Sequence, residues 1–418
     1  MYVTRETSAA VSPAGLRKGL TGINRNVIGL GFTSLFTDIS SEMVSAVLPM
    51  YLVLFLRLSP LQFGLVDGLY QGVGALVKIA FGYAADRLSR HKEVAFLGYA
   101  LSAVCKIGLL AVGSAWGLLA AVVIADRTGK GIRTAPRDAL ISLSAPPQQL
   151  GLAFGVHRAL DTCGAMIGPL VAFTLLSLLP NAFDAVFVAS LSFAVIGLGV
   201  LGLFVENRAV VARGAARPSL GSAFGLLRGR PLQVVTIAGS LLGLATISDA
   251  FLYLGLQQRL NFSSGLLPLL YVVTSLIYFV LAVPLGRLAD RVGRARVFVA
   301  GYLALVLVYG MLLLPTVGVF ELGVALALFG AYYAATDGVL MALASPILPT
   351  ALRTSGMALL TTATSLTRLL ASVVFGALWT WAGVETAILV YLVGLVVALL
   401  VTLLLFRRTA LEPVAVGA

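Results

Sequence analysis

Charged residues are scarce in this sequence. Asp, Glu, Lys and Arg together make up 11% of its 418 residues, whereas soluble domains are about one quarter charged. Hydrophobic residues make up 59%, and the mean hydropathy is +1.01. This composition excludes a chain of two or three soluble domains and indicates a protein that crosses the bilayer many times.

Cysteine and histidine are rarer still. The two cysteines, Cys105 and Cys163, lie inside apolar segments, and the two histidines stand at unrelated positions. A disulfide framework and a metal site are therefore not expected. No Gly-x-x-x-x-Gly-Lys-Ser/Thr loop occurs, which argues against drive by ATP, and no nucleophile–histidine pair supports an enzyme. The prediction is a protein that is not an enzyme and needs no cofactor.

Apolar segments of spanning length, about 20 residues each, predict twelve transmembrane helices. They lie near residues 27–56, 61–84, 94–113, 116–142, 150–179, 183–205, 232–256, 266–286, 297–316, 320–346, 355–381 and 384–406. The first run is too long for the core of a cleavable signal peptide and is expected to be a full span. The expected fold class is an all-α membrane protein.

Lysine and arginine predict the orientation. An even number of spans places both termini on one side, and 19 of the 29 basic residues then fall on that side, two outside and eight within spans. This asymmetry predicts cytoplasmic termini and a location in the cytoplasmic (inner) membrane. It also explains the net charge of +12 without a nucleic-acid partner. The expected partners are the lipid bilayer, a small-molecule substrate and protons, and the protein is expected to be a monomer.

The two halves of the chain resemble each other. Gly82-x3-Asp86-Arg87-x2-Arg90 recurs as Gly286-x3-Asp290-Arg291-x2-Arg294. Intramembrane charges recur as well, in the pairs Asp38 and Asp249, Asp126 and Asp337, and Arg158 and Arg368. A parallel duplication explains both repeats. It predicts an N-terminal tail at 1–25, a six-helix bundle at 26–205, a cytoplasmic linker at 206–231, a second bundle at 232–406 and a C-terminal tail at 407–418.

A charged ladder interrupts the fourth predicted span. It consists of Asp126, Lys130, Arg133 and Arg137, which share one face if the stretch is helical. The ladder is then the wall of a watery cavity inside the bundle; the alternative is a short span followed by a basic cytoplasmic loop. The apolar run before residue 126 is too short to cross the bilayer, which favours the helix. Asp126 and its neighbour Arg127 point apart on a helix, so each is expected to find a partner elsewhere.

Three motifs resemble those of the major facilitator superfamily, over essentially the whole chain. The superfamily's loop motif Gly-x-x-x-Asp-Arg-x-Gly-x-Arg-Lys is similar to both repeats, with Ser89 in place of its second glycine in the first copy and Gly293 in the second. Its fourth-span motif Arg-x-x-Gln-Gly resembles Arg127 to Gly131, with Lys130 in place of glutamine. Its antiporter motif resembles Gly155, Gly164, Gly168 and Pro169, although the closing glycines are Ala172 and Phe173 here.

The resemblance implies two six-helix bundles around a central site that opens alternately to either side. It places the ladder in a membrane helix and favours antiport. Gly164 and Gly168 are equally explained as a seam of small residues at a helix interface. The repeated loops are interpreted as a gating latch that holds helix ends by charge pairs and helix-dipole contacts, and that breaks as the halves rock. Its residues are Gly82, Asp86, Arg87, Arg90, Gly286, Asp290, Arg291 and Arg294.

Charges at membrane depth cost about 2.5–3.5 kcal/mol each and are normally paired or hydrated. Most of these intramembrane charged residues lie in the first half of the chain. There, the number of acidic residues equals the number of basic ones if Lys106 is left out. An ion-pair network inside the first bundle is therefore predicted. Asp38 and Glu42 are the leading candidates for proton coupling, with Arg127 as the counter-charge; the alternative is that they are permanently paired structural ions. The candidates for substrate binding are Lys130, Arg133, Arg158, Asp161, Asp249, Asp337 and Arg368. His157 is interpreted as a hydrogen-bonded packing group, with a proton relay as the alternative.

The predicted function is secondary transport by alternating access, with an activity that resembles proton-coupled export of a small amphipathic compound. The competing prediction is transport, in either direction, of an anionic metabolite or metal chelate bound by Arg127, Lys130, Arg133 and Arg158. Lysine in place of glutamine at position 130 favours the anion. A sensor that has kept a transporter fold is the remaining alternative, and measurable flux across a sealed vesicle would distinguish it from a transporter.

Overall fold

The computed structural model describes residues 24–88, 90–113, 115–146, 149–207, 225, 229–260, 262–314, 318–348 and 353–408. Most of the predicted tails, and most of the predicted linker at 206–231, lie outside these residues. Within the described ranges the regular structure is helical, with no strand. The expected fold class is confirmed.

The first half contains six long helical segments. They are α2 (Arg25–Pro49, continued by the π-helix η1, Met50–Phe55), α3 (Pro60–Leu88), α4 (His91–Ala111), α5 (Trp116–Leu143), α6 (Leu150–Leu178) and α7 (Phe183–Phe204). Each of them coincides with a predicted span, and most of their ends fall within a few residues of the prediction. The boundaries follow the lengths of the apolar runs, as expected for segments that must satisfy their backbone groups internally.

The second half has the same general order. Its elements are α9 (Arg230–Leu244), α10 (Asp249–Leu260), η4 (Ser264–Leu266), α11 (Leu267–Val292), α12 (Arg294–Leu312), α13 (Val319–Ala344), η5 (Ser345–Ile347) and α14 (Arg353–Arg408). Gly383 adopts φ 84° and ψ 163° and divides α14 into two parts, which correspond to the last two predicted spans. A positive φ of this kind favours glycine over residues with a Cβ atom.

One predicted span is broken. The segment predicted at 232–256 consists of α9 and α10, separated by Ala245–Ser248. The Tyr309 hydroxyl accepts a hydrogen bond from the Ile247 N–H at 2.6 Å and donates to the Ala245 carbonyl at 3.3 Å. A side chain from α12 thus satisfies backbone groups that the break would leave unpaired, which is what permits irregular backbone within a membrane bundle.

Nine helices of the described chain are long and apolar enough to cross a membrane. Helices α3 and α5, which carry charged residues, are not among the nine, and α14 counts once although Gly383 divides it. All twelve predicted segments therefore have a helical counterpart in the described residues.

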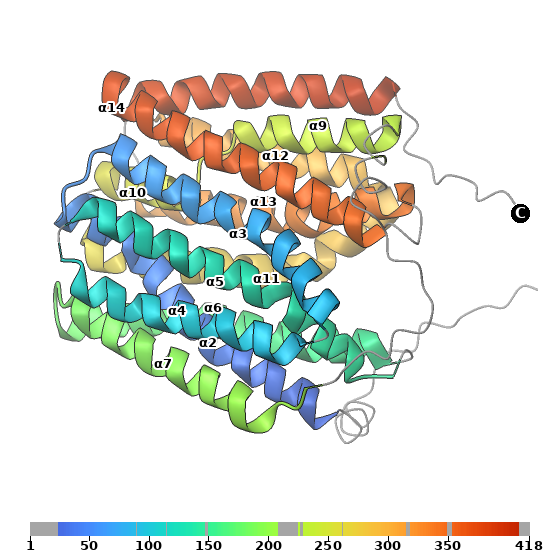
Figure 1. Cartoon of the computed structure of the whole chain (residues 1–418). Helices are drawn as coiled ribbons and strands as arrows, with labels where there is room; N and C mark the ends of the chain where they lie inside the picture. Colours follow the sequence, from blue (N-terminus) through green and yellow to red (C-terminus); the bar gives the residue numbers. More distant parts are fainter. Residues whose placement is uncertain are drawn as a thin grey trace, which may run out of the picture.

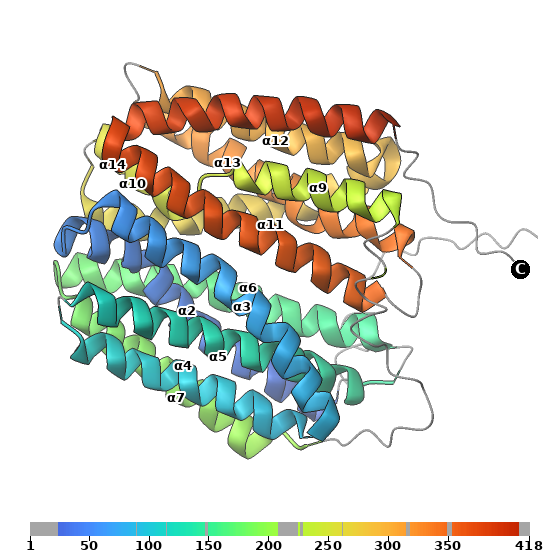
Figure 2. The same ribbon diagram turned by 45° about the horizontal axis from the view of Figure 1, so that its top comes forward.

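The helices form two bundles that lie side by side. Helices α2 to α7 make up one bundle and α9 to α14 the other (Figures 1 and 2). Helix α2 begins, and α14 ends, at the same end of the molecule (Figure 1). This agrees with an even number of spans; that this end faces the cytoplasm stays a prediction.

Candidate functional site

The charged ladder is helical. Helix α5 runs without interruption from Trp116 to Leu143 and contains Pro136 in its interior. The alternative of a cytoplasmic loop is therefore wrong. Asp126, Arg127 and Arg133 are 7%, 5% and 3% exposed, so they are buried within the bundle and need compensating groups.

Asp126 is the centre of a buried triad. Its carboxylate accepts hydrogen bonds from Lys106 Nζ on α4 at 3.0 Å and from Arg127 Nη2 at 2.8 Å. The expectation that Asp126 and Arg127 point apart is wrong, because the long arginine side chain reaches back to its neighbour, although each residue also has the partner elsewhere that was expected. Lys106, which did not fit the predicted charge balance, is the second cation bound to this carboxylate.

The two arginines of α5 have different surroundings. The Arg127 guanidinium lies 3.8 Å from the centre of the Tyr70 ring on α3. Arg133 lies 4.7 Å from the centre of the Tyr99 ring on α4 and donates to the Ser102 hydroxyl at 3.1 Å. Both contacts are cation–π geometries that stabilise a desolvated cation. Arg133 is held within the first bundle by these groups of α4.

The two candidate proton acceptors lie on the face of α2 that contacts α6. A Cβ atom at Gly164 would lie 2.5 Å from the Leu35 carbonyl oxygen and 3.1 Å from Asp38 Cβ. One at Gly168 would lie 2.7 Å from the Ile39 carbonyl oxygen and 3.1 Å from Glu42 Cβ. The two glycines therefore form the predicted helix-packing seam, and they bring Asp38 and Glu42 against α6.

Gly164→Val is expected to destabilise the protein by about 1–3 kcal/mol, the range for overpacking a tight interior. The added atoms must separate α2 from α6. Gly155→Val is the matched control on the same helix, since no atom beyond its chain neighbours and its own helix backbone lies within 4 Å of its Cβ position. The melting temperatures of the two variants, measured by thermal unfolding in the same detergent, are then compared. Equal melting temperatures for both variants would contradict the close approach of α2 and α6.

Asp38 faces a second acid. Its carboxyl lies within electrostatic range of the Asp161 carboxyl on α6. Asp161 is also 3.7 Å from Arg137 Nη1 and 4.0 Å from Arg158 Nη1. Glu42 accepts a hydrogen bond from the Ser45 hydroxyl of its own helix at 2.6 Å. Two neighbouring carboxyl groups disfavour double ionisation, so the Asp38–Asp161 pair is a candidate to hold a single proton.

Arg137 and His157 extend this network. Arg137 Nη2 pairs with Asp138 at 2.9 Å, and its Nη1 donates to the Ser34 hydroxyl at 3.2 Å. Ser34 is also hydrogen-bonded to His157 Nε2 at 2.8 Å. His157 is buried, which fits the packing interpretation. Sequence reasoning gave no role to Ser34, Ser45 or Ser102, because single serines in apolar helices carry no distinguishing pattern.

The acids and bases of the second half have partners of their own. Asp249, the first residue of α10, accepts a hydrogen bond from the Tyr333 hydroxyl of α13. Arg368 of α14 lies within electrostatic range of Tyr332, Tyr333 and Asp337. Asp337 is exposed. Among the predicted substrate contacts, Lys130 and Asp161 belong to the first-half network, whereas Asp249, Asp337 and Arg368 belong to this second group.

The second copy of the repeated loop makes the contacts of a latch. Arg294 pairs with Asp290 at 3.0 Å and donates to the Ala342 carbonyl near the end of α13 at 2.7 Å. Gly293 has φ +112° between α11 and α12, a conformation that favours glycine. In the first copy, the side chains from Gly82 to Ser89 lie outside the described ones, and Arg90 is exposed. Gating by these residues stays a prediction.

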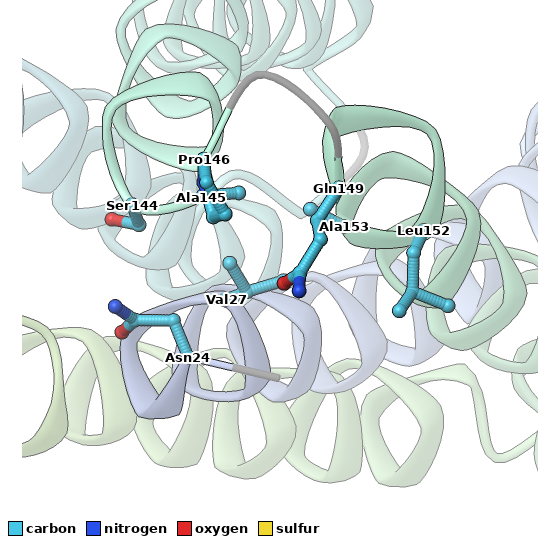
Figure 3. Close-up of a pocket in the computed structure, with 8 residues that line it drawn as sticks. All are labelled: Asn24, Val27, Ser144, Ala145, Pro146, Gln149, Leu152 and Ala153. Atoms are coloured by element: carbon cyan, nitrogen blue, oxygen red, sulfur yellow. The ribbon is translucent and has the colours of Figure 1, made fainter. Parts of the chain in front are cut away.

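A cavity of about 290 Å³ opens where α2 begins and α5 is followed by α6. Figure 3 shows its lining, which consists of Asn24, Val27, Ser144, Ala145, Pro146, Gln149, Leu152 and Ala153. None of these side chains is charged. The cavity therefore does not contain the acids and bases that the sequence singles out.

Comparison with known proteins identifies the family. The family model of the Major Facilitator Superfamily matches residues 30–281 and again residues 246–417. An uncharacterized MFS-type transporter of Methanocaldococcus jannaschii is 32% identical over 371 residues, which cover 85% of this chain and 89% of that protein. An uncharacterized protein of Mycobacterium tuberculosis is 39% identical over 124 residues, 29% of this chain and 30% of that protein.

Solved structures show the same fold. The nucleoside transporter NupG has a TM-score of 0.74 at 17% identity, over 92% of this chain and 99% of its own. A POT family transporter in complex with 5-aminolevulinic acid has a TM-score of 0.77 at 16% identity, with 94% and 98% covered. With the sequence matches, this chain therefore belongs to the Major Facilitator Superfamily: it is an integral, multi-pass membrane protein and a secondary transporter, not an enzyme.

Proposed function

We propose that this transporter exports a small amphipathic compound in exchange for protons. The Asp38–Asp161 pair supports this proposal, because two acids brought close together at the tight α2–α6 contact disfavour double ionisation and can hold one proton between them. A change in hydration or in the position of Arg137 alters how strongly that proton is held. Glu42, one turn along α2, and Arg127, on the facing helix α5, complete the proposed coupling site.

The geometry of the bundles supports alternating access. Helices α3 and α14 are in contact where α3 begins and diverge towards its other end (Figures 1 and 2). Proton binding at Asp38 or Asp161 changes the net charge of a network on α2, α5 and α6, all in one bundle. It shifts the balance between the two states as far as the proton is bound more tightly in one of them, which a difference in the hydration of the pair would cause.

An anionic substrate is the second candidate. Arg158 favours it, since its side chain is 74% exposed and its carboxylate partner Asp161 lies 4.0 Å away. Two of the four basic residues of the predicted anion site already have other partners. Arg127 pairs with Asp126, and Arg133 contacts Ser102 and Tyr99. Lys130 and Arg158 are the side chains that would have to bind the anion.

A thermal-shift screen of the purified protein tests the choice. The probes are tetraphenylphosphonium and ethidium as lipophilic cations, and citrate, inorganic phosphate and ferric citrate as anions, each at pH 6 and pH 8. A ligand at 100 times its dissociation constant stabilises the folded state by about 2.7 kcal/mol. If the protein exchanges its substrate for protons, the cations should stabilise the folded state more at pH 8 than at pH 6, because ligand and proton compete for the acidic pair.

The opposite pattern would decide against export of a cation. Stabilisation by the anions alone, lost in an Arg158→Gln variant, would support the second candidate. Stabilisation by cations to the same extent at both pH values would contradict competition with a proton at the Asp38–Asp161 pair.

A further inference from the structure

The two bundles touch most closely along the first turns of α3. A Cβ atom at Gly64 would lie 2.5 Å from the Ser372 carbonyl oxygen of α14, and one at Gly68 would lie 2.7 Å from the Leu369 carbonyl oxygen. Near the start of α3, the Leu61 N–H donates to the Thr380 hydroxyl at 2.9 Å. We call this the α3–α14 contact. It closes the end of the molecule that the basic residues predict to face outside.

Asp67 is buried in the α3–α14 contact. It is 8% exposed, and its Oδ2 accepts a hydrogen bond from the Ser372 hydroxyl of the other bundle at 2.6 Å. Ser248, at the break between α9 and α10, lies near this carboxyl group as well. None of the salt bridges among the described side chains includes Asp67. Among the described residues, the carboxyl therefore has a hydroxyl partner in the second bundle and no paired cation.

The ionisable groups around Asp67 disfavour a second negative charge. Asp249 of α10 and Tyr271 of α11 face it from the second bundle. On its own side Tyr70 lies one turn along α3, with Arg127 of α5 over the Tyr70 ring. Asp249 has its own partner in Tyr333 and lies within electrostatic range of Arg368. Ionisation of Asp67 would therefore bury two carboxylates across one interface, and Asp67 would lack a paired cation.

We propose that Asp67 is a second proton-binding site of the transport cycle, which holds its proton while the α3–α14 contact is packed and releases it when that contact opens to water. An ionised carboxyl that is buried without a cation is strongly disfavoured, whereas a hydrated one is not. The neutral acid can also keep its hydrogen bond with the Ser372 hydroxyl. By linkage, if packing strengthens proton binding, the proton strengthens packing by the same factor.

The sign of the pH dependence follows. Low pH at the outer face favours the closed contact, and high pH favours the open one. When the open form is ionised and the closed form protonated, the ratio of open to closed molecules rises about tenfold per pH unit. The site is separate from the Asp38–Asp161 pair, which lies within the first bundle, and it needs no substrate.

Spin labels on either side of the contact measure this ratio. Leu65 on α3 and Trp381 on α14 are exposed and are replaced by cysteine in a chain in which Cys105 and Cys163 are alanine. Dipolar distances are recorded in phosphatidylcholine vesicles at pH 5.5, 7 and 8.5, without gradient or substrate. We expect one short distance at pH 5.5 and a growing longer component at higher pH. Asp67→Asn is expected to keep the short distance throughout.

Two further variants make the outcome decisive. Asp67→Ser replaces Asp67→Asn if the latter does not fold, and is likewise expected to lose the pH dependence. Asp184→Asn, at an exposed acid in the first turn of α7, is expected to retain it. A ratio independent of pH in the parent, the parental pH dependence in the Asp67 variants, or its loss in Asp184→Asn would each overturn the inference. Because neither transport nor ligand is needed, failure of proton-coupled export leaves this result intact.

Discussion

Asp126→Asn is expected to lower the free energy of unfolding by about 3–5 kcal/mol, the range for removing one partner of a buried ion pair. The amide keeps the size of the side chain but leaves Lys106 and Arg127, which are 1% and 5% exposed, without the carboxylate that both contact. Total stabilities are only about 5–15 kcal/mol. The yield of folded protein is therefore expected to fall sharply.

Lys106→Met is the matched comparison. It removes one cation and leaves Asp126 paired with Arg127 at 2.8 Å, so the triad becomes a neutral pair. Methionine fills similar space, and we expect a loss below about 1.5 kcal/mol. The double variant leaves one cation, Arg127, over the Tyr70 ring. Its loss in the free energy of unfolding should lie between those of the two single variants.

Thermal unfolding and the monodisperse fraction after size exclusion would complete this double-mutant cycle. Equal losses for Asp126→Asn and Lys106→Met would show that the contacts, and not the balance of charge, determine the stability of this cluster.

The helices were largely predictable because apolar runs of sufficient length have few alternatives in a bilayer. The predicted segment 116–142 agrees with α5, Trp116–Leu143, even though charges fill its second half. The reason is local: the apolar run before residue 126 cannot cross alone. The break between α9 and α10 was not predicted, because it depends on the hydroxyl of Tyr309 in another helix.

The pairing within the site was less predictable than its members. The sequence pattern indicated Asp126, Arg127 and Asp38 as members of the site. Which of them are in contact depends on the length and conformation of each side chain, and Arg127 folds back to pair with Asp126. The sequence indicated no role for Asp67. Its hydroxyl partner Ser372 lies 305 residues away, and one serine in an apolar helix gives no signal of that contact.

Asp38→Asn is expected to abolish export driven by a pH gradient and to leave exchange of substrate without a gradient. Asparagine is nearly isosteric and cannot release a proton, so Asp161 loses the group with which it shares one. The measurement uses proteoliposomes and the compound that gives the largest thermal shift. Gradient-driven flux and counterflow are recorded on the same preparation, because only the first needs a titrating group.

Two other variants locate the coupling acid. Asp184→Asn alters an exposed acid in the first turn of α7 and should keep both activities. Glu42→Gln tests the other candidate, whose described partner is the Ser45 hydroxyl. If Glu42→Gln alone lost the driven flux, Glu42 would be the coupling acid and the Asp38–Asp161 contact a structural pair. Loss in both variants would instead indicate one proton shared along the face of α2, since the two acids are one helical turn apart and a change at either alters the field at the other.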